Sequence, residues 1–253
     1  MQKVITDQVA ELLAGFGRLG NFVGDMARSL RDFKVWLGLT AVQMRRIGVD
    51  SLPISLLVAA FTGVVLALLS RYIFTGAVPM YFVGTLVGKA IMMELGPVLV
   101  CLALAGRVGA SIAAELGTMR VTEQVDALET LAYDTQSFLV VPRVLAATLM
   151  FPVIVAFAVT AGLLTGWLTS VTLIDLSTVD FLKGLRLFYQ FKDIWFGLLK
   201  SMSFGFTIAL IGCMKGLNTR GGAEGVGRAT TQAVVVSAGM ILVLDALWAV
   251  LLL

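Results

Sequence analysis

The sequence predicts an all-α polytopic membrane protein, and three observations lead to that class. Hydrophobic residues make up 58% of the 253 residues and charged residues only 14%, with a mean hydropathy of +0.95, which lies outside the usual range of soluble domains. The apolar residues gather into segments of about 20 residues, the length that crosses a bilayer as a helix. Short polar stretches separate these segments. The chain therefore has room for five or six transmembrane helices and for no separate soluble domain.

Residues 1–50 are predicted to form an amphipathic segment that lies in the membrane interface. Over residues 4–28, apolar side chains recur at steps of three and four, with charged side chains on the opposite side. Those charges interrupt the apolar run, so no cleavable signal peptide is expected. The alternative interpretation is a helix packed on the protein's own cytoplasmic side. Residues 51–253 are then expected to form the domain of five spans.

The five spans follow from the apolar segments. The second is longer than about 20 residues and contains Gly96-Pro97, which should bend or divide it because proline lacks the N–H that a helix interior needs. Between the third and fourth spans, residues 172–193 read as a mixed loop. The spans are expected at about Ile54–Phe74, Tyr81–Ala114, Val144–Val171, Ile194–Met214 and Ala233–Leu253.

The distribution of Lys and Arg predicts the orientation. Seven of these residues lie in the first 50, whereas Arg71 alone lies between there and Lys89, so the N-terminus should be cytoplasmic. The acidic stretch 115–134 and the loop 215–232 then also face the cytoplasm, and residues 172–193 and the C-terminus face the periplasm. The net charge of +3 is explained as a topology signal and not as a nucleic-acid surface.

Enzymatic chemistry finds little support in the sequence. The chain contains no histidine, which removes the commonest general base and metal ligand. Neither an HExxH nor a GxSxG pattern is present, so an intramembrane hydrolase is not expected. Cys101 and Cys213 lie in apolar segments, where free cysteines act as small buried hydrophobes. We expect no catalytic residue, metal site or cofactor.

The segment from Gly222 to Arg228 superficially matches a phosphate-binding loop. It lacks the chemistry, because Arg228 stands where the motif has lysine and Ala229 where it has the hydroxyl that holds Mg²⁺. No strand pattern precedes it. We interpret it as a glycine-rich cytoplasmic turn before the last span.

Small residues recur at every fourth position along the second span. Such a thin helical face allows another helix backbone to approach closely. It would serve either a dimer interface or packing among the spans of one subunit, and the sequence leaves both open. The four residues are Ala105, Gly109, Ala113 and Gly117.

Three ionisable residues, Glu94, Lys200 and Asp245, lie inside predicted spans. A charge at the bilayer centre is costly, so such residues by default suggest a functional site. Counting from the span ends at about 1.5 Å per residue places all three at similar depth. They would form either a structural ion pair or the polar lining of a cavity, and both interpretations remain open.

A short amphipathic helix is predicted over residues 122–129, after the second span. Thr122 is a good N-cap, and Glu123 and Asp126 lie near the first turn, where acids favour the helix dipole. The alternative is an ordinary solvated connecting helix. Its apolar stripe consists of Val125, Leu128 and Leu131.

Five runs of sequence resemble one family. The chain is similar to the permease subunits of Mla-type ABC lipid transporters (the MlaE/YrbE family), the partners of MCE-domain proteins in Gram-negative envelopes. Relatives often have an arginine before the glutamate of the first run, and here that position is Met93. The runs are ELGPVL, AGRVGASIAAELGTM, TEQVDAL, VVPRVLA and GGAEGVGRATTQAVV.

The resemblance implies a function and a set of partners. It implies an inner-membrane homodimer with two ATP-binding cassette ATPase subunits, an MCE-protein ring, often a STAS-domain subunit, and phospholipid as cargo, in the service of outer-membrane lipid asymmetry. ATP would be hydrolysed by the partner and not by this chain. Glu94, Lys200 and Asp245 would line the lipid cavity. A proton-coupled secondary transporter of a hydrophobic substrate, using Glu94 and Asp245, is the alternative. The ATPase would contact the helix carrying Thr122, Glu123, Gln124, Val125, Asp126 and Leu128.

Overall fold

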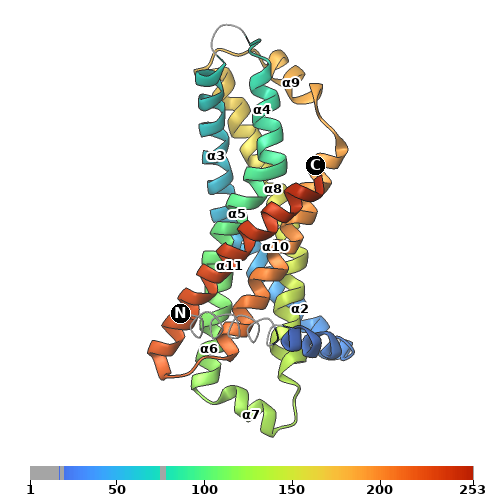
Figure 1. Ribbon diagram of the computed structural model, residues 1–253, viewed down its shortest axis with the longest axis vertical. Helices are drawn as coiled ribbons and strands as arrows, with labels where there is room; N and C mark the ends of the chain where they lie inside the picture. Colours follow the sequence, from blue (N-terminus) through green and yellow to red (C-terminus); the bar gives the residue numbers. More distant parts are fainter. Residues whose placement is uncertain (1–16, 18–19, 75–77, 253) are drawn as a thin grey trace, which may run out of the picture.

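The computed structural model describes residues 17, 20–74 and 78–252, and all regular secondary structure among these residues is helical. The helices form an elongated bundle with the short helix α7 (Gln124–Thr130) at one end and α9 (Thr178–Leu187) at the other (Figure 1). Within the described residues, five helices are long and apolar enough to cross a membrane. This confirms the predicted all-α polytopic class. The five are Val35–Ile73, Phe82–Val121, Gln136–Leu173, Phe191–Leu217 and Gly222–Leu251.

The first three spans are longer than predicted, at 38 to 40 residues. Helices of that length are much longer than the roughly 20 residues that a bilayer core requires. The additional turns of these spans form the polar end of the bundle. The first span joins three helical segments without a break at residue 50. These are α2 (Phe33–Gly48), a 3-10 turn at Val49–Ser51 and α3 (Leu52–Ile73).

The second span is modified at two points but not broken. A π-helical stretch, η2, comes directly before Gly96-Pro97, and Pro97 stands in the first turn of the following helix, where its missing N–H is not needed. Proline is therefore accommodated by one wide turn. The segments are α4 (Phe82–Ala90), η2 (Ile91–Leu95), α5 (Gly96–Leu104), the π-helical η3 (Ala105–Gly109) and α6 (Ala110–Val121).

Two segments predicted as loops are helical. Residues 172–193 contain α9, whose first turn is capped by the Ser177 hydroxyl accepting from the Asp180 backbone N–H. The expected glycine-rich turn is confined to Gly221 and Gly222, where φ is positive, and the rest of it is the start of the last span. The remaining helices are the π-helical η4 (Gln136–Val140), α8 (Val141–Leu173), α10 (Phe191–Leu217) and α11 (Gly222–Leu252).

The N-terminal helix predicted over residues 4–28 lies partly outside the described residues. Its described part is helical over 20–29 and packs on the protein itself, because Met26 is buried in the core and Phe22 contacts it. The Ser137 hydroxyl lies 3.4 Å from the Ser29 carbonyl oxygen, which joins this helix to the start of the third span. These contacts favour packing on the protein's own body for residues 20–29.

The small-residue face of the second span packs inside the subunit. Ala105 and Ala113 are completely buried, and a Cβ atom added at Gly212 of α10 would lie 3.1 Å from the Gly109 carbonyl oxygen. A Cβ atom at Gly117 would likewise lie 2.9 Å from the Thr219 hydroxyl. Of the two interpretations, packing among spans of one subunit is therefore the one that the structure supports.

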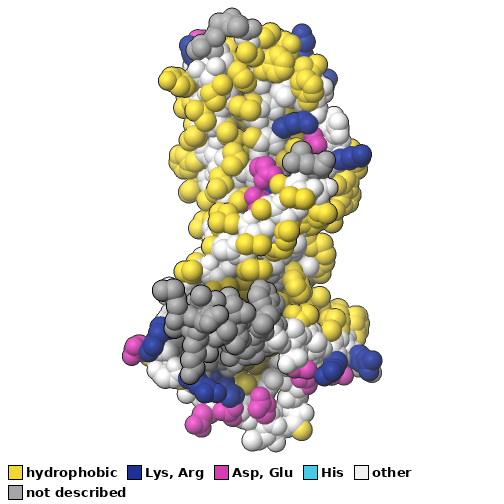
Figure 2. Space-filling model, in the orientation of Figure 1, with side chains coloured by type: hydrophobic (Ala, Val, Ile, Leu, Met, Phe, Trp, Pro, Cys, Tyr) yellow, Lys and Arg dark blue, Asp and Glu magenta, His cyan; other side chains and the backbone are white. Residues whose placement is uncertain are grey.

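The surface of the bundle divides into two zones. Figure 2 shows hydrophobic side chains over most of its length, with acidic and basic side chains gathered around the end that carries α7. α11 crosses the bundle obliquely (Figure 1), and only 11% of its most apolar stretch is buried, against 28–56% in the other spans. The last span thus presents a largely free apolar face.

Candidate functional site

Lys200 brings the three predicted membrane charges together. Its ammonium nitrogen lies 2.7 Å from Glu94 Oε2 and 2.5 Å from Asp245 Oδ1. The Lys200 side chain is completely buried, whereas those of Asp245 and Glu94 are 25% and 43% exposed. The cluster is therefore a buried cation between two acids, and Glu94 is its most accessible member.

Backbone geometry explains why Lys200 can reach Glu94. Glu94 lies in the π-helical stretch η2, and Gly197 of α10 meets this stretch one turn before Lys200. A Cβ atom at Gly197 would lie 2.3 Å from the Met92 carbonyl oxygen, so only glycine permits this approach. The second and fourth spans are thus in backbone contact beside the ion cluster.

Aromatic side chains enclose the cluster. The Lys200 ammonium lies 5.4 Å from the centre of the Phe196 ring, which packs edge-on against Trp248 of α11. The Trp248 indole N–H donates to the Ser203 hydroxyl at 3.0 Å. These contacts exclude water from one side of the ammonium and strengthen its attraction to the two carboxylates.

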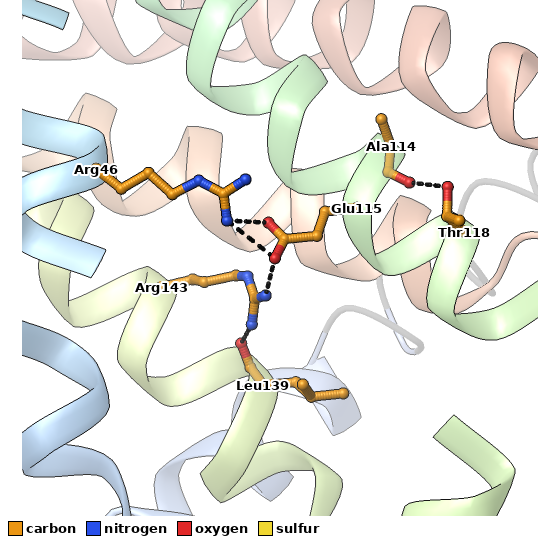
Figure 3. Close-up of polar contacts among 6 residues, drawn as sticks. All are labelled: Arg46, Ala114, Glu115, Thr118, Leu139 and Arg143. Atoms are coloured by element: carbon orange, nitrogen blue, oxygen red, sulfur yellow. Dashed lines mark hydrogen bonds and ion pairs between the residues drawn. The ribbon is translucent and has the colours of Figure 1, made fainter. Parts of the chain in front are cut away.

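A second ion cluster lies near the α7 end and was not predicted. Glu115 of α6 accepts hydrogen bonds from Arg46 of α2 and Arg143 of α8, each at 3.0 Å (Figure 3). Arg143 also donates to the Leu139 carbonyl at 2.6 Å, and its side chain is only 5% exposed. One carboxylate therefore ties together the first three spans immediately before α7.

The sequence contained a signal for this cluster that we assigned differently. Arg46 is one of the seven basic residues of the first 50 that indicate topology, and Arg143 lies in the run VVPRVLA directly before the predicted third span. A cavity of about 160 Å³ beside Glu115 is lined by polar residues of the first and second spans, among them Arg46, Asp50 and Arg107. Arg107 also donates to the Ser51 hydroxyl. The ends of the spans near α7 are thus joined by polar contacts as well as by packing.

Helix α7 exposes some of its predicted contact residues and buries others. Val125 is only 2% exposed and packs in the subunit's own core, and Leu128 is partly buried against that core. These two pack α7 against the subunit, and of the two Leu128 keeps part of its side chain exposed. The exposed members of the predicted set are Thr122, Glu123, Gln124 and Asp126.

The predicted N-cap of this helix is wrong. The Thr122 hydroxyl donates back to the Thr118 carbonyl at 2.8 Å, inside the last turn of α6. Glu123 takes the cap position with a left-handed backbone (φ 61°) and makes no side-chain cap. That backbone geometry turns the chain sharply from α6 into α7. The earlier helix therefore continues to Val121 and ends just before this turn. Asp126 pairs with Arg120 across this turn.

Asp134 closes the connection between α7 and the third span. Partial burial disfavours its charge, but hydrogen bonds from the Ser137 and Ser29 side chains and from the backbone N–H groups of Gln136 and Ser137 outweigh this and lower the pKa of the carboxyl. Asp134 is therefore a stable anion at neutral pH. It fixes residues 20–29 to the same end of the bundle as α7.

Removal of the Glu115 charge should destabilise the subunit. Glu115→Gln leaves the buried Arg143 without its carboxylate. Breaking a buried ion pair costs about 3 kcal/mol, and the cost here is smaller because the Glu115 side chain is partly exposed. We expect thermal unfolding in detergent several degrees below that of the unmodified protein. Asp25→Asn is the matched control, because its pair with Arg28 is exposed and contributes little. Equal melting of both variants would contradict this role for Glu115.

The bundle of five apolar helices, with paired charges inside it and a short helix at one end, defines a multi-pass membrane protein. Comparison with known protein families gives a match over most of the chain. The family model "Permease MlaE" matches residues 40–251. The chain belongs to this family of permeases.

Several curated relatives are similar over most of the chain. A probable ABC transporter permease protein of Rickettsia prowazekii is 43% identical over 209 residues, covering 83% of this chain and 81% of the relative. One from Synechocystis is 42% identical over 200 residues, covering 78% and 75%. The TRIGALACTOSYLDIACYLGLYCEROL 1 protein of Arabidopsis thaliana chloroplasts is 35% identical over 206 residues, covering 81% of this chain and 59% of the relative.

Proposed function

We propose that this permease moves phospholipid as the membrane subunit of an ATP-driven transporter that maintains outer-membrane lipid asymmetry. The observation that carries the proposal is the Lys200 cluster, a cation and two acids inside an otherwise apolar bundle of the MlaE family. An apolar surface suits acyl chains, and a charged cluster suits a headgroup. One relative is named after a galactosylated diacylglycerol, a glycerolipid, which supports a lipid substrate.

The cluster would line a cavity between two copies of the chain. The largely free apolar face of α11 suits a homodimer interface, and Asp245 of the cluster lies on that helix. In this arrangement Glu94, the exposed member, contacts the headgroup first, and the buried Lys200 sets the charge balance behind it. This differs from the sequence-based expectation that Lys200 itself faces the cavity.

Membership of the permease family supports an ATPase partner, and the other partners are part of the proposal. An ATP-binding cassette ATPase would hydrolyse ATP and contact α7 through Glu123, Gln124 and Asp126. An MCE-protein ring would meet the opposite end, and a STAS-domain subunit would bind beside the ATPase. The chain would lie in the bacterial inner membrane with its N-terminus in the cytoplasm and its C-terminus in the periplasm, as the Lys and Arg distribution indicates.

Reconstitution of the permease with its ATPase tests this proposal against a proton-coupled transporter. We expect fluorescent phospholipid to leave the proteoliposomes only with ATP, and transfer to stop with an ATPase variant unable to hydrolyse ATP. A proton ionophore should change nothing. Transfer that persists without the ATPase and stops with the ionophore would instead support secondary transport through Glu94 and Asp245.

A further inference from the structure

Helix α9 presents one outward stripe that combines apolar and basic side chains. The stripe residues follow the spacing i, i+3, i+4, i+7, i+8, so they lie on a single helix face. All five are exposed. They are Val179, Leu182, Lys183, Arg186 and Leu187.

The opposite face of α9 is fixed to the second span, so the stripe is held outward. Gly184 packs directly on the α4 backbone, where an added Cβ atom would lie 1.7 Å from the Tyr81 carbonyl oxygen. The Thr85 hydroxyl donates to the Gly184 carbonyl at 2.5 Å, and Phe181 is buried beside this contact. α9 and α4 lie side by side at this end of the bundle (Figure 1).

An apolar groove of about 420 Å³ runs between α8 and α9. Its volume lies within the range of small-molecule sites, about 300–1,000 Å³. The Trp167 indole N–H donates to the Thr178 hydroxyl at 3.3 Å, which places the amphipathic Trp167 ring in the groove wall. Apart from Thr160 and Thr178, the wall consists of Leu163, Leu164, Trp167, Phe181, Leu182 and Leu185.

Two cations lie beside the groove on the open outer face of α9. They are Lys183 and Arg186, and they share this face with Leu182 of the groove wall. The Lys183 ammonium also lies 4.9 Å from the centre of the Tyr81 ring. Within the described part of the chain, neither cation has a carboxylate within ion-pair distance. Asp180 is engaged in the cap of α9 through the Ser177 hydroxyl at 2.7 Å. This face of α9 therefore carries a net positive charge.

The surroundings of the groove suit contact with lipid. On α8, Leu164, Leu168 and Leu173 are all exposed and form an apolar surface that suits the hydrocarbon of a bilayer. Tryptophan and basic side chains are typical of the level where acyl chains meet headgroups. Figure 2 shows basic side chains within the apolar surface at this end of the molecule.

We propose that the α8–α9 groove is a phospholipid site that prefers anionic headgroups. One acyl chain lies in the groove along Leu163 and Trp167, and the phosphate is bound by Lys183 and Arg186. Arginine and lysine both bind phosphate oxygens through charge-assisted hydrogen bonds. The site is separate from the Lys200 cluster, which involves α10, α11 and η2, and it requires only that the protein is in a bilayer and not that it transports lipid.

Quenching of Trp167 by brominated phospholipids tests the site. In full-length protein with Trp36, Trp195 and Trp248 replaced by phenylalanine, brominated phosphatidylglycerol should quench Trp167 at much lower mole fraction than brominated phosphatidylcholine. Each basic side chain near a membrane surface gives roughly a fivefold preference for an anionic lipid, so two give about 25-fold. Lys183→Gln with Arg186→Gln should remove the preference, and Thr160→Phe should reduce quenching by both lipids because it fills the groove.

A control variant and an independent measurement complete the test. Lys192→Gln removes an exposed positive charge outside the groove and should keep the preference. In the background with all four tryptophans, native mass spectrometry should show one phosphatidylglycerol per subunit fewer in the Lys183→Gln, Arg186→Gln variant than in Lys192→Gln. Equal quenching by both lipids in the unmodified groove, or an unchanged preference in the double variant, would overturn the proposal. Neither outcome would bear on ATP-dependent transport through the Lys200 cluster.

Discussion

Replacing Lys200 by methionine should reduce the amount of folded subunit strongly and abolish lipid transfer. The change leaves the carboxylates of Glu94 and Asp245 together in the membrane with no cation. Breaking a buried pair costs about 3–5 kcal/mol, and every 1.4 kcal/mol is a factor of ten in an equilibrium. We therefore expect at least a hundredfold shift toward unfolded or misassembled protein, measured as monodisperse yield and thermal unfolding in detergent.

The neutral triple variant separates a structural from a functional role of the cluster. Because Lys200 contacts two acids, removing it with Asp245 alone still leaves Glu94 uncompensated. Glu94→Gln, Lys200→Met and Asp245→Leu together remove all three charges and should restore folding, since apolar replacements of buried ion clusters are often neutral or stabilising. If the cluster also contacts the headgroup, the folded triple variant should transfer less than a tenth as much phospholipid.

One result would decide against that functional role. Full transfer by the triple variant would reduce the cluster to a structural ion group. Lys192→Met is the control for loss of an exposed cation: Lys192 is exposed on α10 and forms no ion pair among the described residues, so its loss should cost about 1 kcal/mol or less. If this control lowered folding as much as Lys200→Met does, the argument that burial makes the loss of Lys200 costly would be wrong.

Reversing the charges of Glu123 and Asp126 to lysine should weaken ATPase binding at least tenfold and leave the subunit folded. Both side chains are exposed on α7, and the pair between Asp126 and Arg120 lies at the surface, where such pairs contribute about 0–1 kcal/mol. Binding is measured by co-purification and by titration of the ATPase onto permease in nanodiscs. Lipid-stimulated ATP hydrolysis should fall in parallel.

Val125→Ala is the matched control on the same helix. Val125 packs in the core, so its truncation should lower stability by roughly 1–3 kcal/mol through lost burial and the resulting cavity. It removes no exposed side chain. We expect it to lower the melting temperature more than it weakens ATPase binding, opposite to the charge reversal. Normal complex formation by the Glu123→Lys, Asp126→Lys variant would reject α7 as the ATPase contact.

Pattern and composition were sufficient for the architecture but not for the ends of its helices. The five spans came from apolar runs, a signal that depends only on segment length and hydropathy. The predicted spans were too short because the helices continue beyond the apolar runs as amphipathic segments. The mean hydropathy of these segments is too low to identify them as parts of a span. α9 was missed for the same reason, since its stripe mixes Lys183 and Arg186 with leucines.

The ion clusters illustrate the limits of one-dimensional reasoning. Glu94, Lys200 and Asp245 were identified because charge in a span is costly, and depth counting correctly placed them at one level. That Lys200 is the buried member and Glu94 the accessible one depends on Gly197 and the π-helical stretch, which no periodicity reveals. The Glu115 cluster joins residues 69 and 28 positions apart, and its members look like ordinary topology charges in sequence.

The sequence by itself determined the class of protein, its five spans, its membrane-embedded charges and its family resemblance, because these depend on local hydropathy, residue identity and motif. Tertiary structure alone decided three further points. It buried the small-residue face within one subunit, turned Val125 inward and Glu123 outward, and placed the cations of α9 beside an apolar groove. The physical reason is that side-chain exposure and pairing depend on which helix faces meet, and those contacts join residues far apart in the chain.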